Sequence, residues 1–191
     1  MSTELIEDQD LVRQDFTTTP LPKGEYARCR FVQCTFIRSD LSRIVFDECS
    51  FEECDLSLAR INGTAFRNVR FARCKMLGLH FDTANAFLFS ILPEHCDLDS
   101  CSFRGMRLEK IRFTHCDLRG ADLSGTILKG AVLDHCGLRD TVFERTDLQQ
   151  ADLRNARDHV IDPERNNVKH ARFSLEGLPG LLAKHALRIE E

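Results

Sequence analysis

The sequence predicts a solenoid, in which a short repeat winds around one continuous apolar core. From Phe16 to Phe81 every fifth residue is large and apolar, and the same is true from Leu98 to Leu153. An α-helix repeats every 3.6 residues and a strand every two, so neither keeps a five-residue stripe on one face over this length. The repeating unit is therefore a pentapeptide with a large apolar residue at its centre.

A second position of the repeat is small, and it lies two residues before each centre. All nine cysteines of the chain occupy this position. The clearest units are CDLRG at 116–120 and ADLSG at 121–125, which follow the pattern A(D/N)LXX. On these units the chain resembles the pentapeptide-repeat family over roughly residues 15–155. The resemblance implies an all-β fold, a right-handed quadrilateral β-helix with four pentapeptides per coil. It also implies that the centre and the small residue both face inward.

A coil of twenty residues places positions i and i+20 above each other, about 4.8 Å apart like adjacent strands. The predicted core stack contains the centres Phe31, Phe51, Phe71, Leu98, Leu118 and Leu138 and the small residues Cys34, Cys54 and Cys116. Opposite charges recur at the same spacing on the outside, at Arg28–Glu48, Asp40–Arg60, Asp47–Arg67, Glu53–Arg73, Asp99–Arg119, Glu109–Lys129 and Asp134–Arg154. Exposed ion pairs stabilise by only about 0–1 kcal/mol, so these pairs serve mainly to check the register.

The two apolar stripes are out of register by two residues, which predicts an interruption at 82–95. If the second stripe begins at Leu88, with Ala86 inward, then Pro93 stands at a centre. Proline cannot donate to a β-ladder, so we expect a bulge, kink or short loop. Phe87 and Phe89 lie off the centres. Two interpretations are open: a local register correction or a loop that binds a partner.

The expected organisation is an N-terminal tail at 1–14, the β-helix at 15–155, and a connector with a C-terminal dimerisation cap at 156–191. In the cap, Leu178, Leu181 and Leu182 share one face of a short helix. Residues 187–189 alternate like a final strand.

The tail carries a second resemblance. Residues 162–189, with the stretches CKMLG at 74–78 and ARFSL at 171–175, are similar to pentapeptide proteins that protect type II topoisomerases, the fluoroquinolone-resistance (Qnr and MfpA type) and albicidin-resistance proteins. That resemblance implies a two-fold homodimer whose rod mimics B-form DNA and binds DNA gyrase or topoisomerase IV. The predicted dimer interface consists of Phe173, Leu178, Leu181, Leu182, Leu187 and Ile189.

No arrangement of residues indicates catalysis, so we expect no enzyme activity, no metal and no cofactor. The C-x4-C spacing at Cys29/Cys34 and elsewhere could indicate zinc. Yet the five-residue period already forces that spacing, and we interpret the cysteines as small buried filler. His115 and His135 should stack on one outward column. We expect a solvated pair, because two ligands alone make a poor metal site.

The formal net charge of −4 is too small in magnitude for a protein that binds nucleic acid directly through bulk charge. The densest acidic cluster is Asp47, Glu48, Glu52 and Glu53, which is either a solvated face or, with Phe87 and Phe89, part of a partner-binding surface. No run of about eighteen apolar residues is present, so no membrane span is expected. The first thirty residues lack the apolar core of a signal peptide, which predicts a cytoplasmic location.

The leading functional hypothesis is therefore a non-enzymatic DNA mimic that binds a topoisomerase and protects it from poisons of the quinolone or albicidin type. The alternative hypothesis is a pentapeptide-repeat scaffold that binds a different regulatory protein.

Overall fold

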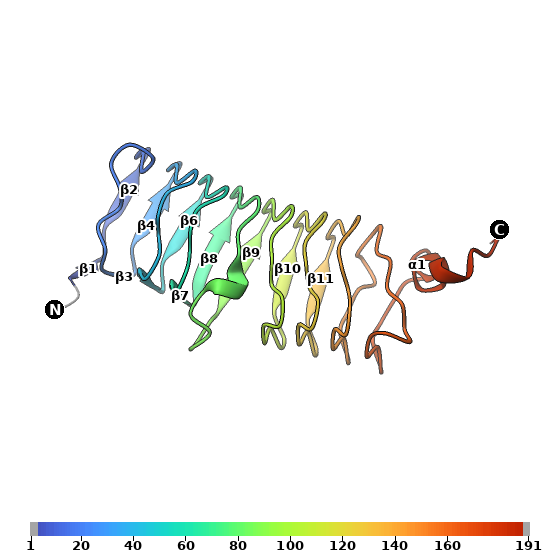
Figure 1. Cartoon of the computed structure of the whole chain (residues 1–191). Helices are drawn as coiled ribbons and strands as arrows, with labels where there is room; N and C mark the ends of the chain where they lie inside the picture. Colours follow the sequence, from blue (N-terminus) through green and yellow to red (C-terminus); the bar gives the residue numbers. More distant parts are fainter. Residues whose placement is uncertain (1–3, 189–191) are drawn as a thin grey trace.

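Short strands recur along the chain and pair in parallel with strands of the neighbouring coils, as seen in the computed structural model, which describes residues 4–188 (Figure 1). A four-stranded sheet contains β1 (Leu5–Glu7), β3 (Glu25–Ala27), β5 (Val45–Asp47) and β7 (Ala65–Arg67). A seven-stranded sheet contains β2 (Asp10–Val12), β4 (Arg30–Val32), β6 (Ser50–Glu52), β8 (Val69–Ala72), β9 (Ile91–Glu94), β10 (Arg112–Thr114) and β11 (Val132–Asp134). The chain thus forms the predicted right-handed, four-sided β-helix.

The rod has four sides, which we number in chain order. The first side carries the four-stranded sheet and the second side the seven-stranded sheet. The third and fourth sides consist of turns joined by isolated bridges, such as Asp117↔Gly137 on the third and Asp122↔Val142 on the fourth. Partners in these bridges lie twenty residues apart, as Phe31 and Phe51 do between β4 and β6. The predicted register is therefore confirmed outside the interruption.

The centres fill the interior of the rod completely. Phe31, Phe51, Phe71, Leu98, Leu118 and Leu138 are all fully buried, and Cys34, Cys54 and Cys116 are 1–2% exposed. The predicted core stack is thus observed. Rings of successive coils lie face to face, with centroids 4.6 Å apart for Phe31 and Phe51 and 5.0 Å apart for Phe51 and Phe71. A rod packed in this way leaves its outer surface as the place where binding can occur.

The small inward residue also donates a hydrogen bond, which the filler interpretation did not include. The Cys54 thiol donates to the carbonyl oxygen of Phe31, with Sγ and O 3.4 Å apart, and the Thr64 hydroxyl donates to that of Leu41 at 2.7 Å. Each acceptor is a centre on the preceding side, one coil earlier. The position therefore favours small side chains that can satisfy a buried carbonyl group. Burial raises the pKa of Cys49 and of Cys101 to about 12, so these thiols stay protonated at neutral pH.

Most corners of the coil are residues in the left-handed region, two places after a centre. Examples are Leu58, with φ at 58°, and Gly120, with φ at 63°. At many of the turns an aspartate directly before the centre accepts a hydrogen bond from the backbone N–H two residues later. Asp117 Oδ1 and the Arg119 nitrogen are 3.0 Å apart. This side-chain cap of the turn explains the aspartate of the A(D/N)LXX pattern.

Four of the seven predicted charge pairs form. The distances between the charged atoms are 3.0 Å for Asp40–Arg60, 3.9 Å for Asp47–Arg67, 3.1 Å for Glu53–Arg73 and 3.0 Å for Asp99–Arg119. In the other three pairs one or both members bond another residue instead. Arg28 bonds Glu7 and Asp8, Glu109 bonds Arg107, and Arg154 bonds Asp152.

The interruption adds two residues to one coil, since Phe71 of β8 pairs with Pro93 of β9. The extra length forms a 3-10 turn, η1 (Phe81–Thr83), and a loop that protrudes beside β7 and β9 (Figure 1). Pro93 is buried at a centre, as expected. The expectation for Leu88 and Ala86 was wrong, because both are exposed and Phe89 packs inward instead. Two added residues shift the inward position from Leu88 to Phe89.

The solenoid extends beyond both predicted boundaries. At the N-terminus β1 and β2 pair with β3 and β4, so 4–14 is part of the first coil rather than a tail. At the other end the bridge Asp152↔Arg172 continues the second side past residue 155. The expected connector is thus a final, irregular coil, in which Asn166 is buried and donates to the carbonyl group of Phe143 at 3.1 Å.

The C-terminal segment ends in a short helix, α1 (Leu178–Leu182), followed by the 3-10 turn η2 (Ala183–His185). Leu187 and Arg188 lie in no strand, and Ile189 falls outside the described residues. Within residues 4–188, no helix is long and apolar enough to cross a membrane.

Candidate functional site

The acidic cluster lies at two successive corners, after β5 and after β6. Asp47 and Glu48 end the first side, and Glu52 and Glu53 end the second side of the same coil. Arginines of neighbouring coils surround them: Arg30 bonds Glu52 at 3.3 Å, and Arg73 contacts both Glu52 and Glu53.

Hydrogen bonds from Gln33 and then Arg73 hold the pKa of Glu53 below its ordinary value. The cluster is therefore one part of a network of both charges, and its acids are joined to bases above and below. The four predicted acids do lie together, but they do not form an uninterrupted negative stripe.

The interruption provides the most apolar part of the outer surface away from the ends. Phe87 and Leu88 are 67% and 63% exposed, and Leu92 on β9 is 48% exposed. Phe89 lies behind them with its ring centroid 6.1 Å from those of Phe66 and Phe81. Of the two predicted phenylalanines, then, Phe87 faces solvent and Phe89 anchors the loop to the core. A groove of about 490 Å³ runs beside the loop, over β9 and the corner at 107–112.

The predicted dimer residues occupy the C-terminal end of the rod. Leu178, Leu182 and Leu187 are exposed, by 42%, 39% and 59%. Phe173 and Leu181 are half-buried against the core. Leu175, which the helical pattern did not select, is 86% exposed. These side chains make the end of the rod apolar, as a solenoid end is when no further coil covers it.

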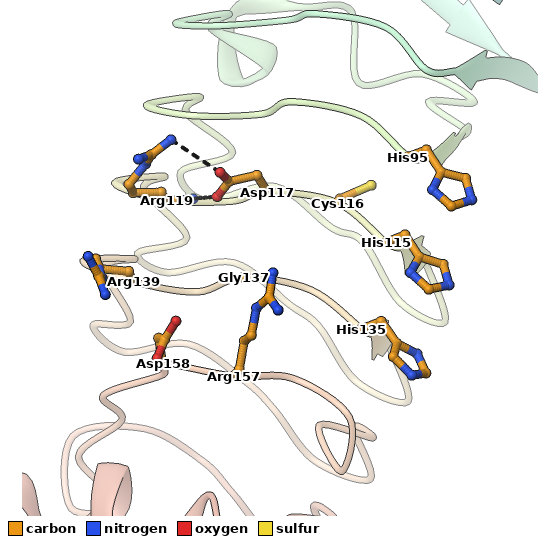
Figure 2. A pocket seen from close by; sticks show the side chains of 10 residues that line it. All are labelled: His95, His115, Cys116, Asp117, Arg119, His135, Gly137, Arg139, Arg157 and Asp158. Carbon is orange, nitrogen blue, oxygen red and sulfur yellow. Dashed lines mark hydrogen bonds and ion pairs between the residues drawn. The ribbon is translucent and has the colours of Figure 1, made fainter.

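A polar groove of about 410 Å³ lies on the third side, near the C-terminal end of the rod (Figure 2). His95, His115 and His135 form one rim, each directly after a strand of the second side. Their rings stack with centroids 4.6 and 4.7 Å apart. The predicted stack of His115 and His135 is thus extended by His95. The spacing of twenty residues from His95 to His115 could have shown this, but His95 falls at the end of the interruption, where the register was uncertain.

Arginines form the opposite rim and the floor of this groove. Arg119 and Arg139 stand on the far rim, and Arg157 extends across the floor over Gly137 (Figure 2). Stacked parallel rings cannot direct three nitrogens at one ion, and no group of three or more metal-ligating side chains converges anywhere in residues 4–188. The arrangement offers cationic donors to an anion instead. Sequence reasoning did not select Arg139 and Arg157, because arginines are scattered over every side of the rod.

Comparisons with known proteins agree with this fold. A family model described as "Pentapeptide repeats" matches eight copies, over residues 29–68, 95–134 and 128–157. No curated protein sequence matches the chain. Three solved structures of QnrB1, described as a plasmid-mediated fluoroquinolone resistance protein, are similar over nearly their whole length.

One trypsin-treated QnrB1 variant aligns with a TM-score of 0.76 at 18% identity, covering 100% of this chain and 93% of that one. A second trypsin-treated variant aligns with a TM-score of 0.62 at 18% identity, covering 98% and 100%. Full-length QnrB1 aligns with a TM-score of 0.56 at 16% identity, covering 96% and 100%. At these identities the likeness establishes the fold.

Proposed function

The chain belongs to the pentapeptide-repeat family, and from this premise we propose that it is a non-enzymatic DNA mimic that binds DNA gyrase or topoisomerase IV. Bound in the place of DNA, it protects the enzyme from poisons of the quinolone or albicidin type. The observation that carries this proposal is the likeness in fold to QnrB1, a fluoroquinolone resistance protein, over 100% of this chain and 93% of that one. The match includes both ends of the rod and is not limited to the repeats.

The proposal includes a two-fold homodimer formed end to end. Leu178, Leu182 and Leu187 are exposed at the C-terminal end, and a second copy would cover them in an isologous contact. The dimer doubles the length of the rod, so that its length is more similar to that of a segment of duplex DNA. Sedimentation of a chain that ends at Arg172 tests this part. We expect a monomer, and an unchanged dimer mass contradicts the proposed interface.

Contact with the enzyme is assigned to the interruption loop and to the acidic corner after β5. The exposed side chains of Phe87 and Leu88 provide apolar area on an otherwise polar rod, and exposed aromatic residues are enriched where proteins bind each other. Glu48 stands at a corner beside the paired acids and faces solvent together with them. Both features lie on the first side or its edges, so a single partner surface can reach them.

A gyrase supercoiling assay with and without a fluoroquinolone tests the function. We expect the protein at micromolar concentration to inhibit supercoiling or to reduce drug-induced DNA cleavage. Phe87→Ser should weaken the effect, and the matched control Val160→Ser, at a residue that is 60% exposed elsewhere, should not. Glu48→Arg should weaken it as well, with Asp140→Arg as the control at another corner of the same backbone geometry.

One observation favours the second candidate function, a scaffold for a different regulatory protein. The acids Glu52 and Glu53 are paired with Arg30 and Arg73, whereas a mimic of the DNA backbone needs unpaired negative charge. If the protein neither inhibits gyrase and topoisomerase IV nor protects them at micromolar concentration, the topoisomerase proposal fails and the scaffold remains.

A further inference from the structure

The groove on the third side brings together three arginines and three histidines (Figure 2). Three coils contribute one histidine each to its near rim, with ring centroids 4.6 and 4.7 Å apart. The far rim carries Arg119 and Arg139, and Arg157 lies in the floor. The coils of His115 and His135 each add an arginine on the far rim as well, Arg119 and Arg139. The donors therefore form a row along the groove, which suits a ligand with several charges in a row.

The floor of the groove is open because of one substitution within the repeat. The column of residues before the centres runs Asp97, Asp117, Gly137 and Arg157, each bridged to the next. Where the first two coils have a carboxylate, the third has a glycine. A Cβ atom added at Gly137 would lie 3.5 Å from Asp117 Oδ1 and 4.0 Å from Arg157 Nε. Gly137 thus leaves the space into which the Arg157 side chain extends, and it removes the negative charge that would neutralise that arginine.

The arginines of the groove differ in how far they are paired. Arg119 bonds Asp99 at 3.0 Å and Asp117 at 3.2 Å. Among residues 4–188, no carboxylate forms an ion pair with Arg139 or Arg157. The charged groups around the histidine column are Glu94, Asp97, Asp117, Asp134, Asp158, Arg119, Arg139 and Arg157; of these, Asp134 bonds His135 at 3.0 Å. Two guanidinium groups therefore have donors free for an anion.

We propose that this groove binds a linear oligophosphate, a chain of phosphate groups of small-molecule size. Guanidinium groups bind phosphate oxygens through paired hydrogen bonds. A single-stranded nucleic acid would need exposed aromatic rings on which its bases could stack, and the phenylalanines of these coils face inward. An acidic peptide would need an apolar pocket or a free strand edge for its affinity, and the groove is lined by polar side chains, Gly137 and the buried Cys116.

The histidine rim makes the binding depend on pH. Histidine is the side chain that gains charge between pH 5 and 8, and three imidazoles standing side by side repel one another once charged. A bound polyanion offsets that repulsion, so binding and proton uptake favour each other. Phosphate groups become less negative as the pH falls. Tighter binding at lower pH therefore has to come from the protein.

Isothermal titration calorimetry with inorganic tripolyphosphate at pH 6 and pH 8 tests the proposal on the full chain. We expect saturable binding of one ligand per chain that is about tenfold tighter at pH 6 than at pH 8, which corresponds to an average uptake of about half a proton on binding over this range. Replacing His95, His115 and His135 by Asn, which also tolerates the corner backbone, should remove the tightening at pH 6. At pH 8 this variant should bind through the arginines about as tightly as the unchanged chain.

Two further variants identify the groove. Arg139→Ala with Arg157→Ala should weaken binding at least about tenfold, whereas Arg104→Ala with Arg145→Ala, which removes two arginines from a groove on the fourth side, should leave it unchanged. Gly137→Asp should also abolish binding and keep the fold, because the same column already holds aspartate at 97 and 117. The proposal is overturned if tripolyphosphate gives no saturable heat, or if the two arginine pairs have equal effects. None of these measurements involves a topoisomerase.

Discussion

The coils before and after the interruption have the same geometry and are stabilised differently. Before it, the centres are mostly aromatic, and rings stack from coil to coil, as Phe31, Phe51 and Phe71 do on the second side. After it, leucine fills most centres, such as Leu118, Leu123 and Leu128. The first side also changes, from the strands β1, β3, β5 and β7 to turns.

The C-terminal coils contain more residues that stabilise their turns. Two left-handed corners before the interruption are glycine, Gly63 and Gly78, and four after it are: Gly105, Gly120, Gly125 and Gly130. Aspartate-capped turns also become more frequent, at Asp97, Asp117, Asp122, Asp147 and Asp152 against Asp15, Asp40 and Asp55. The N-terminal part therefore relies more on the packing of its side chains, and the C-terminal part more on the conformation of its backbone.

The largest expected loss of stability comes from removing one ring of the aromatic stack. Phe51→Ala should lower the free energy of unfolding by about 3–5 kcal/mol, because Phe51 is fully buried between Phe31 and Phe71. Leu118→Ala, at a fully buried centre after the interruption, should cost less, since stacked rings contribute about 0.5–1.5 kcal/mol beyond the buried area. Urea unfolding followed by circular dichroism measures both.

Tyr26 is the only tyrosine and the chain has no tryptophan, so its fluorescence reports the N-terminal part separately. Phe51→Ala should shift the fluorescence transition at least as far as the transition seen by circular dichroism. Equal losses for the two variants in both signals would remove the contrast between the two cores.

A smaller effect is expected at the corners after the interruption. Gly120→Ala should lower stability by about 1 kcal/mol, because an L-residue is strained in the left-handed region. The φ angle of Gly120 is 63°, and the nearest atom to an added Cβ is 3.4 Å away, so the cost is conformational rather than a clash. Gly137→Ala is the matched control, since Gly137 lies outside the left-handed corners and its Cβ would have room. If both alanine variants unfold at the same urea concentration, the corner does not carry the expected strain.

The period-five pattern was sufficient to predict the sides, the register and every buried cysteine, because each property depends only on position in the repeat. It failed where the repeat changes length. Leu88 stands at the expected centre, but two inserted residues turn it outward and Phe89 inward. In the last coil, the expected connector, His159 and Ile161 are buried, whereas a continued five-residue period would bury 158 and 163. That coil is covered by the C-terminal segment rather than by another coil, so its inward residues follow a different spacing.

The candidate surfaces were harder to predict than the fold. The acidic cluster could be read from adjacent corners, but its neutralisation by Arg30 and Arg73 depends on side-chain conformations across three coils. The groove on the third side requires His95 to be in register with His115, and that register passes through the interruption. Surface function in a solenoid therefore depends on which columns align, which a single change of repeat length can alter.

Removing the aspartate of one capped turn should lower the free energy of unfolding by about the contribution of one hydrogen bond. In Asp122→Ala the backbone N–H of Ser124 loses its acceptor, Asp122 Oδ1, which is 2.8 Å away. We expect a loss of about 0.5–1.5 kcal/mol in urea unfolding. Asp122→Asn keeps an oxygen in the same place and should lose less than half of that. A full loss in the asparagine variant would assign the effect to charge instead of to the cap.

Loss of the contact of the C-terminal segment with His159 should have the smallest effect on global stability, because this contact is confined to the end of the rod. His159 is 4% exposed, neither ring nitrogen has a hydrogen-bond partner, and its ring packs against Phe173 with centroids 5.4 Å apart. The C-terminal segment lies directly on it, because a Cβ at Gly180 would be 1.9 Å from the His159 carbonyl oxygen. Burial lowers the pKa of His159 below its ordinary value of 6.5.

With this lowered pKa, the docked segment holds His159 uncharged at a pH where a solvated histidine already binds a proton. The detached state therefore takes up more protons, so docking is favoured above about pH 6.5 and weakens as the pH falls below it. Hydrogen exchange at the amides of 174–186 should accelerate at pH 5.5, after correction for the intrinsic pH dependence, while the coils before the interruption stay protected. In His159→Phe the ring volume remains and the acid effect should disappear. His170→Asn, at an exposed corner, should keep it. Acid-induced exchange that persists in His159→Phe would assign the weakening to the ion pairs of Lys184 with Asp162 and Glu164.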